Sequence, residues 1–399
     1  MLTSRSDLCN EKHSPSFPSE KTTAADKDDT EARCQVDSSL ERLLLPFTLV
    51  QYVSFIPMYS IRRGLVSPDG PLAYLYSLLG FCLFTSISVY RNAILHRTRL
   101  SSLHLFTLYS DLVSFVINYS LSLICNVVNS KSNVEFVCRL QRLQTVLRRY
   151  QREQEQFARS NWAYLAAVTA LYLAVVGLLN VVVLKQSLPD TLYLLLLFCI
   201  DVNVLYATRM LALLRCYLQL WTRKINEKAF NPVHHNMFTA YLDILQEYEV
   251  YTTLFKKIIT YYVLETFLHG LLYVQVAIQI CKSIRRSGRF SEQLMMIVSI
   301  FTWTIKNMII MTLHNVECEK FYLAAEQAVA ACQTQRASTT RCREEKRLYK
   351  NVCRVSRAAF SRERGWGLLA AGAALTLRFM DLATTYVTVL LQFAFVSRT

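Results

Sequence analysis

Long apolar stretches alternate with polar, basic segments along most of the chain. Eight stretches carry almost no charge: roughly 43–60, 72–95, 103–128, 162–184, 190–218, 258–281, 291–313 and 366–396. A helix of about 20 residues crosses a hydrocarbon core of about 30 Å, because each helical residue adds about 1.5 Å. All but the first stretch are long enough, so the pattern predicts an all-α integral membrane protein with seven transmembrane helices.

The first apolar stretch, 43–60, is short and contains Pro46, Gln51 and Pro57, which disfavour a spanning helix. We therefore interpret residues 40–71 as an interfacial pre-span segment, a helix or a hairpin that ends at Arg62 and Arg63. Residues 1–39 are rich in Ser, Thr, Asp, Glu and Lys and have almost no apolar periodicity. This composition predicts a disordered cytoplasmic tail.

The long loops between the spans contain amphipathic segments. Apolar residues recur every 3 or 4 positions over 238–255, which predicts a helix that runs directly into the 258–281 span. Residues 72–313 are therefore predicted to form a six-helix bundle with cytoplasmic helical extensions. Similar spacing makes 314–365 a cytoplasmic helical anchor loop. The apolar stripes of these helices need a partner, either another loop of the same chain or a neighbouring subunit.

The composition supports a membrane protein and gives its orientation. The chain is 53% hydrophobic and only 18% charged, with a mean hydropathy of +0.23, which does not suit a soluble protein of 399 residues. Its net charge of +15 does not indicate nucleic-acid binding, because Lys and Arg lie between the apolar stretches rather than on one face. Most lie in the long loops, which predicts that these loops and the N-terminus are inside and the C-terminus outside.

The sequence offers no catalytic or cofactor-binding motif. The 12 Cys include no CxxC pair, and the His residues have no metal-ligand spacing. We also find no Ser/His/Asp order and no Gly-rich phosphate loop. We therefore expect no enzyme activity, cofactor or metal site.

The last apolar stretch carries the most specific motif. Thr385-Tyr386 is followed by five residues and then by Gln392-Phe393. This resembles the C-terminal signature of the insect gustatory (taste) receptor family, and the large inner loops and short outer tail are similar to that family as well. Val387 stands where sugar-sensing members typically have Glu, which argues against a sugar receptor. The resemblance implies a tastant-gated, non-selective cation channel subunit for bitter or other non-sugar compounds.

The same resemblance implies an inverted topology, with the N-terminus inside, and a homo- or heterotetramer with related subunits in the plasma membrane of sensory neurons. Its partners would be a small-molecule tastant and membrane lipid. Residues 72–313 would be the ligand-binding bundle, and 366–399 would form the pore-lining last helix and short outer tail. The residues assigned to the pore or gate are Thr385, Tyr386, Val389, Gln392 and Phe393. Four copies of Gln392 could replace part of an ion's hydration. Alternatively, this face packs against neighbouring helices.

Charged residues inside spans are functional candidates because they are costly in the membrane. Asp111 and Asp201 fall at outer and middle depths, where the family's ligand pocket opens. The candidate ligand-binding residues are Tyr109, Asp111, Tyr193, Asp201, Tyr273 and Trp303. An acidic group among aromatic walls favours an amine-bearing tastant. Glu265 and Lys306, which we assign to the inner half, are predicted to form a structural pair. The alternative is that Asp111 and Asp201 only bond across helices while Trp303 fills the core.

Two other functions compete with the channel. A seven-helix G-protein-coupled chemoreceptor would usually carry Asp-Arg-Tyr and Asn-Pro-x-x-Tyr motifs, but both are absent and Asn231-Pro232 lies in a loop. A transporter would be expected to show an internal repeat, and we find none. The channel remains the preferred prediction.

Overall fold

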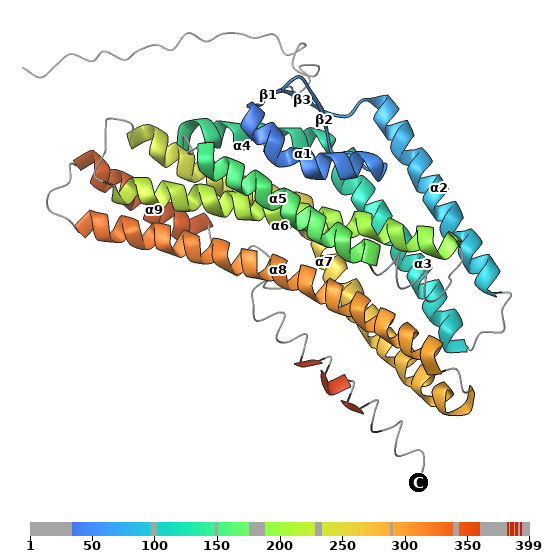
Figure 1. The fold of residues 1–399 in the computed structure, drawn as a ribbon. Coiled ribbons are helices and arrows are strands. Elements are labelled where there is room, and N and C mark those ends of the chain that lie inside the picture. The colour runs from blue at the N-terminus through green and yellow to red at the C-terminus, as the bar shows by residue number, and fades with distance from the viewer. Residues whose placement is uncertain are drawn as a thin grey trace, which may run out of the picture. The chain divides into compact units, whose positions relative to one another are not determined.

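The computed structural model describes residues 34–96, 102–147, 151–174, 188–227, 234–287, 290–337, 343–359 and several positions from Asp381 to Gln392. This part of the chain is nearly all helical (Figure 1). Its α-helices are α1 Ser38–Val53, α2 Pro71–His96, α3 Ser102–Leu123, α4 Ser130–Leu147, α5 Gln151–Tyr172, α6 Leu188–Asn226, α7 His234–Ser287, α8 Phe290–Ala337 and α9 Arg343–Ala359, and a short π-helix, η1 Ile124–Val128, joins α3 to α4.

Among the described helices, five are long and apolar enough to cross a membrane: Pro71–His96, Leu105–Val128, Leu197–Asn226, Met237–Lys282 and Gln293–Ala337. They coincide with five of the predicted spans, and the protein is a multi-pass membrane protein. Of the other two predicted spans, 162–184 is described only as far as residue 174, and 366–396 only at several positions from Asp381 to Gln392. The total of seven therefore stays a prediction.

A small antiparallel sheet is an addition to the predicted all-α fold. Its order is β1–β3–β2, with β1 at Cys34–Gln35, β2 at Ser60–Arg62 and β3 at Leu65–Ser67. Arg63 and Gly64 join β2 to β3 with φ values of 53° and 76°. Two positive φ angles are typical of the tight turn that matches hairpin twist, and Gly64 adopts its angle without a Cβ penalty.

The predicted tail boundary at residue 39 is wrong, because residues 34–39 belong to the folded part. Val36 is only 4% exposed, and α1 already begins at Ser38. The pre-span segment contains both of the predicted alternatives in succession, helix α1 and then the β2–β3 hairpin. Gln51, awkward for a spanning helix, is buried and donates to Asn203 Oδ1 at 3.3 Å.

Helices α7 and α8 are long and continuous, at 54 and 48 residues. The predicted helical run from 238–255 into the 258–281 span is therefore confirmed. α9 packs against both α8 and α7. The apolar stripe of α8, with Phe321 and Cys332, and that of α9, with Tyr349 and Val352, are buried in one core. These stripes are covered within the chain, as the first of the two alternatives requires.

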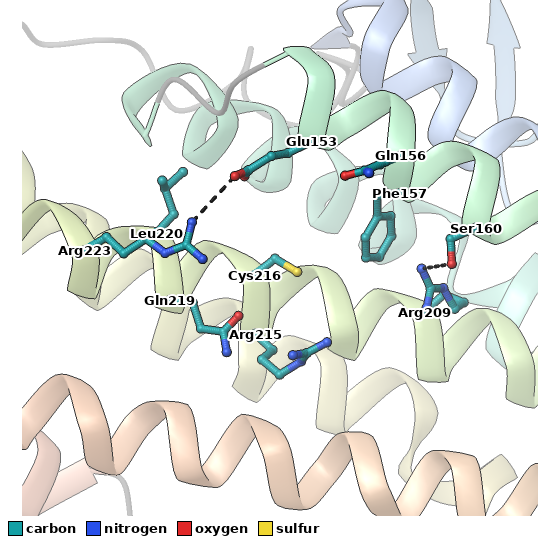
Figure 2. Close-up of a pocket in the computed structure, with 10 residues that line it drawn as sticks. All are labelled: Glu153, Gln156, Phe157, Ser160, Arg209, Arg215, Cys216, Gln219, Leu220 and Arg223. Atoms are coloured by element: carbon teal, nitrogen blue, oxygen red, sulfur yellow. Dashed lines mark hydrogen bonds and ion pairs between the residues drawn. The ribbon is translucent and has the colours of Figure 1, made fainter.

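Two hollows lie between the described helices. One of about 470 Å³ lies between α5 and α6 and is lined by several arginines (Figure 2). The other is small, with a volume of about 30 Å³, and is lined by residues of α3, α6, α7 and α8. Because the second hollow is surrounded by most of the candidate ligand-binding residues, it defines the candidate site.

Candidate ligand-binding site

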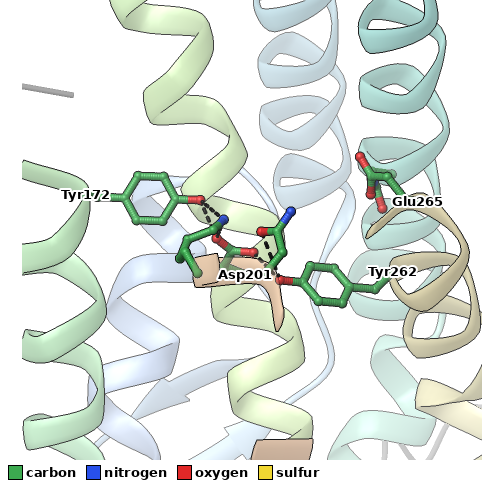
Figure 3. Close-up of polar contacts among 7 residues, drawn as sticks. Tyr172, Asp201, Tyr262 and Glu265 are labelled. Carbon is green, nitrogen blue, oxygen red and sulfur yellow. Dashed lines mark hydrogen bonds and ion pairs between the residues drawn. The ribbon is translucent and has the colours of Figure 1, made fainter. Parts of the chain in front are cut away.

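Asp201 of α6 is the centre of a buried polar cluster and is only 2% exposed. Tyr262 of α7 donates its hydroxyl to Asp201 Oδ1 at 2.9 Å. Tyr172 of α5 and Lys306 of α8 both donate to Oδ2, and Lys306 also donates to the Tyr172 hydroxyl at 3.0 Å (Figure 3). A buried ion pair needs several such hydrogen bonds to offset the loss of hydration. Four helices are therefore joined through one carboxylate.

Lys306 is also enclosed by aromatic rings. Its ammonium group lies 3.8 Å from the centroid of the Trp303 ring and 4.9 Å from that of Tyr172. Trp303 and Lys306 are three residues apart on α8 and therefore share a face. Aromatic faces attract a desolvated cation. The pocket thus already holds a cation of its own, between an acidic group and aromatic walls.

The predicted partner of Lys306 is wrong. Lys306 forms its ion pair with Asp201 rather than with Glu265. Glu265 instead accepts a hydrogen bond from Asn118 of α3 and lies 3.6 Å from His269 Nδ1. Depth counted from predicted span ends misled the assignment, since α7 and α8 continue far beyond the apolar stretches as unbroken helices.

A second polar cluster surrounds His269 of α7, which is 8% exposed. Its Nε2 lies 3.2 Å from Asp111 Oδ1 on α3, and its ring stacks on Tyr273 with centroids 5.5 Å apart. Tyr273 also donates to Asp111 Oδ1 at 3.4 Å. His269 therefore lies between two carboxylates, those of Asp111 and Glu265, and a proton on its ring would offset part of their charge.

The two clusters line one cavity. Its lining residues are Asp111, Leu197, Ile200, Asp201, Tyr262, Glu265, His269, Tyr273, Trp303, Lys306 and Asn307. A free volume of about 30 Å³ has room for one or two waters, whereas small-molecule pockets usually have several hundred Å³. A ligand would therefore have to move the walls apart. The lining holds three carboxylates, Lys306 and His269, so it carries a net negative charge when His269 is neutral, which suits a positively charged guest.

The structure brings together most of the predicted ligand-binding residues. Asp111, Asp201, Tyr273 and Trp303 line the cavity, and both aspartates also bond across helices, as the alternative interpretation expected. Tyr109 does not: it is 49% exposed and its ring lies near that of His96. The side chain of Tyr193 lies outside the described residues.

Sequence reasoning missed Tyr172, Tyr262 and His269. Tyr262 and His269 lie three residues before and four residues after Glu265, on the same face of α7. Extending the helical spacing from Glu265 would have found both. Tyr172 lies on α5, and no pattern in the sequence relates it to Asp201.

Only part of the predicted pore face is described. Thr385, Val389 and Gln392 are exposed in the single chain, and Phe393 lies outside the described residues. Tyr386 instead contacts α7, where Gln275 Nε2 donates to its hydroxyl at 2.9 Å. Thr388 donates back to the Thr384 carbonyl at 2.8 Å, which satisfies a hydroxyl in an apolar helix.

No family model and no curated protein matches this sequence. The structure is nevertheless similar to that of the insect olfactory receptor OR5 from Machilis hrabei, with a TM-score of 0.59 and 12% identity, over 90% of this chain and 100% of the receptor chain. The structure of OR5 in complex with eugenol gives a TM-score of 0.57 at the same identity and coverage. The protein therefore has the fold of an insect olfactory receptor.

Proposed function

We propose that the protein is a gustatory receptor, a subunit of a tastant-gated, non-selective cation channel in the plasma membrane of sensory neurons. The supporting observation is its structural likeness to the full length of an insect olfactory receptor chain. The C-terminal motif of Thr385-Tyr386 and Gln392-Phe393 favours the taste branch, and Val387 favours bitter or other non-sugar compounds. On this proposal the chain has no enzymatic role.

The exposed face of the last helix supports a pore. Gln392 is exposed on a helix within an apolar stretch, and an amide facing lipid would be costly. Around a symmetry axis, four such amides would face water and permeating cations. Val389, which is 41% exposed, would add an apolar ring able to gate by dewetting.

The small acidic cavity supports gating by an amine-bearing ligand. OR5 has been captured with the small molecule eugenol, and the cavity of this chain lies among helices of the same fold. An incoming amine would compete with Lys306 for Asp201 and for the Trp303 face. Displacing Lys306 would loosen the α6–α8 contact. A ligand that fits this loosened arrangement better would shift the equilibrium toward it.

The orientation of the termini tests the proposal without a ligand. Small epitope tags at each end would be probed with antibodies in intact and in permeabilised cells. We expect the N-terminal tag to be accessible only after permeabilisation and the C-terminal tag in both conditions. The reverse pattern would contradict the channel and favour the alternative, a G-protein-coupled chemoreceptor.

Currents in excised membrane patches test gating directly. Quinine, a bitter amine, and denatonium, a bitter quaternary ammonium cation, are suitable probes, and the bath would contain no GTP. We expect cation currents, and we expect Gln392→Ala to change the relative permeability of Na⁺ and Cs⁺. Thr384→Ala is the control. Its side chain lies about 100° around the helix axis from that of Thr385, and the substitution should leave the permeability ratio unchanged. A current that depends on GTP would contradict the channel.

A further inference from the structure

The larger hollow, between α5 and α6, has no role in the proposed gating. Its volume is about 470 Å³. Glu153, Gln156, Phe157 and Ser160 of α5 form one wall, and the α6 wall carries three arginines, Arg209, Arg215 and Arg223 (Figure 2). A hollow of this size between two helices, with three guanidinium groups in its lining, suits a multiply charged anion.

Arg209 is the buried cation of this hollow, at 7% exposure. Its Nε donates to Asn161 Oδ1 at 2.7 Å, and its Nη2 donates to Ser160 Oγ at 3.3 Å. The guanidinium carbon lies 4.2 Å from the centroid of the Phe157 ring and 4.7 Å from that of Tyr164. All four groups are neutral. Within the described part of the chain, no carboxylate lies within ion-pair distance of Arg209, although buried charges are usually paired.

The carboxylates that pair with the other two arginines do not neutralise the charge of the hollow. Arg215 pairs with Glu317 of α8 at 3.1 Å, but Glu317 also pairs with Lys320 at 3.0 Å. Arg223 lies 3.5 Å from Glu153, and both side chains are well exposed, at 66% and 41%, so solvent weakens that pair. The walls of the hollow therefore carry surplus positive charge around a buried guanidinium.

We propose that this hollow binds a phosphate group at the end where Arg209 lies, with Arg209 as the buried ligand, while Arg215 and Arg223, further along α6, add positive charge to the rest of the lining. The planar fork of a guanidinium matches the geometry of phosphate oxygens and keeps its charge when buried. Ser160 and Gln156 supply neutral polar groups beside it. The phosphate belongs either to a lipid headgroup or to a soluble phosphate ester, because both present the same chemistry to the arginines.

Binding to the purified full-length receptor in detergent tests the proposal. The probe is a fluorescent short-chain phosphatidylinositol bisphosphate, followed by fluorescence anisotropy. We expect Arg209→Gln to weaken binding about tenfold or more, the usual loss for a charge-assisted hydrogen bond. Because loss of Arg209 could also disturb folding, Gln156→Glu is the second variant. It places a carboxylate on an exposed part of the wall and should weaken binding by about tenfold as well.

Arg159→Gln is the matched control. Arg159 lies on the same helix, is 82% exposed and does not line the hollow. It should leave the probe's affinity within about twofold of the unsubstituted protein, since an exposed charge outside the site contributes little. Equal affinity of all variants, or no binding of the probe, would overturn the proposal.

Competition identifies the source of the phosphate. Inositol trisphosphate and inorganic phosphate would be added against the bound fluorescent lipid. Displacement by inositol trisphosphate at an affinity similar to that of the lipid would assign the site to soluble phosphate esters. Displacement only by unlabelled short-chain lipid, with the Gln156→Glu effect preserved, would assign it to a headgroup.

Discussion

The two halves of α7 have opposite distributions of polar and apolar side chains. In the half that packs with α4, α6 and α9, Tyr241, Tyr251 and Phe255 are fully buried. In the other half, Leu264 and Leu268 are 51% and 48% exposed, whereas His269 is 8% exposed. The first half is apolar inside, as in a water-soluble protein. The second exposes large apolar side chains and buries His269 together with Val276 and Ile280.

Helix α8 repeats this reversal. Phe321 and Ala328 are buried in one half, whereas Phe301 and Ile305 are 49% and 56% exposed in the other, next to the buried Lys306. Burial away from water stabilises the first half. Lipid can surround the second half, where polar contacts and close packing hold the helices together. The comparison predicts that lipid surrounds the second half, in which the polar cavity lies.

Removing one member of the buried ion pair should have the largest effect. Asp201→Leu leaves Lys306 buried without its carboxylate, which costs about 3–5 kcal/mol of unfolding free energy. Thermal unfolding in detergent would measure it. The double variant Asp201→Leu with Lys306→Met should recover most of the loss. An equally unstable double variant would show that the ion pair is not the cause.

Matched phenylalanines on α8 sharpen the comparison between the halves. Phe321→Ala opens a cavity in the packed half, since this side chain is fully buried, and should cost about 3–4 kcal/mol. Phe301→Ala removes a side chain that is 49% exposed and should cost less than about 1 kcal/mol. Chemical denaturation of the detergent-solubilised protein would compare them. Similar losses at both positions would break the distinction.

Adding a charge at exposed apolar positions tests which half faces lipid. Ile305→Arg should raise the free energy of membrane insertion by about 2.5–3.5 kcal/mol, the usual cost of Arg near the membrane centre. Leu323→Arg, 46% exposed in the packed half of the same helix, should change it by less than about 0.5 kcal/mol. A glycosylation-based insertion assay reports both values. Equal insertion costs would mean that both positions face the same environment and would contradict the assignment of lipid to one half only.

A single hydroxyl in the cavity should have the smallest effect. Tyr262→Phe removes the hydrogen bond to Asp201 Oδ1 and should cost about 1 kcal/mol of unfolding free energy. Tyr90→Phe on α2, where the side chain is 61% exposed, is the control and should change stability by less than about 0.5 kcal/mol. A shift in thermal unfolding temperature measures both. An unchanged Tyr262→Phe protein would mean that water replaces the hydroxyl.

The sequence predicted helices well but not the contacts between them. Spacing of 3 or 4 residues was enough to extend α7 beyond its apolar stretch, because periodicity is a local property. The partner of Lys306 depends on how α6, α7 and α8 are rotated about their axes, which no local pattern contains. Tyr109 failed for a related reason, since two residues along a helix reverse the face. The two- and three-residue strands β1, β2 and β3 were too short to show any alternation.

We propose that four copies of this chain surround a pore lined by the last helix. Single-particle electron microscopy of the purified full-length protein tests it most directly and needs no ligand. We predict a fourfold particle with the Gln392 side chains around the axis and the exposed apolar face of α8, including Ile305, toward the surrounding detergent. A monomer, or an assembly in which Gln392 lies away from the axis, would contradict the account.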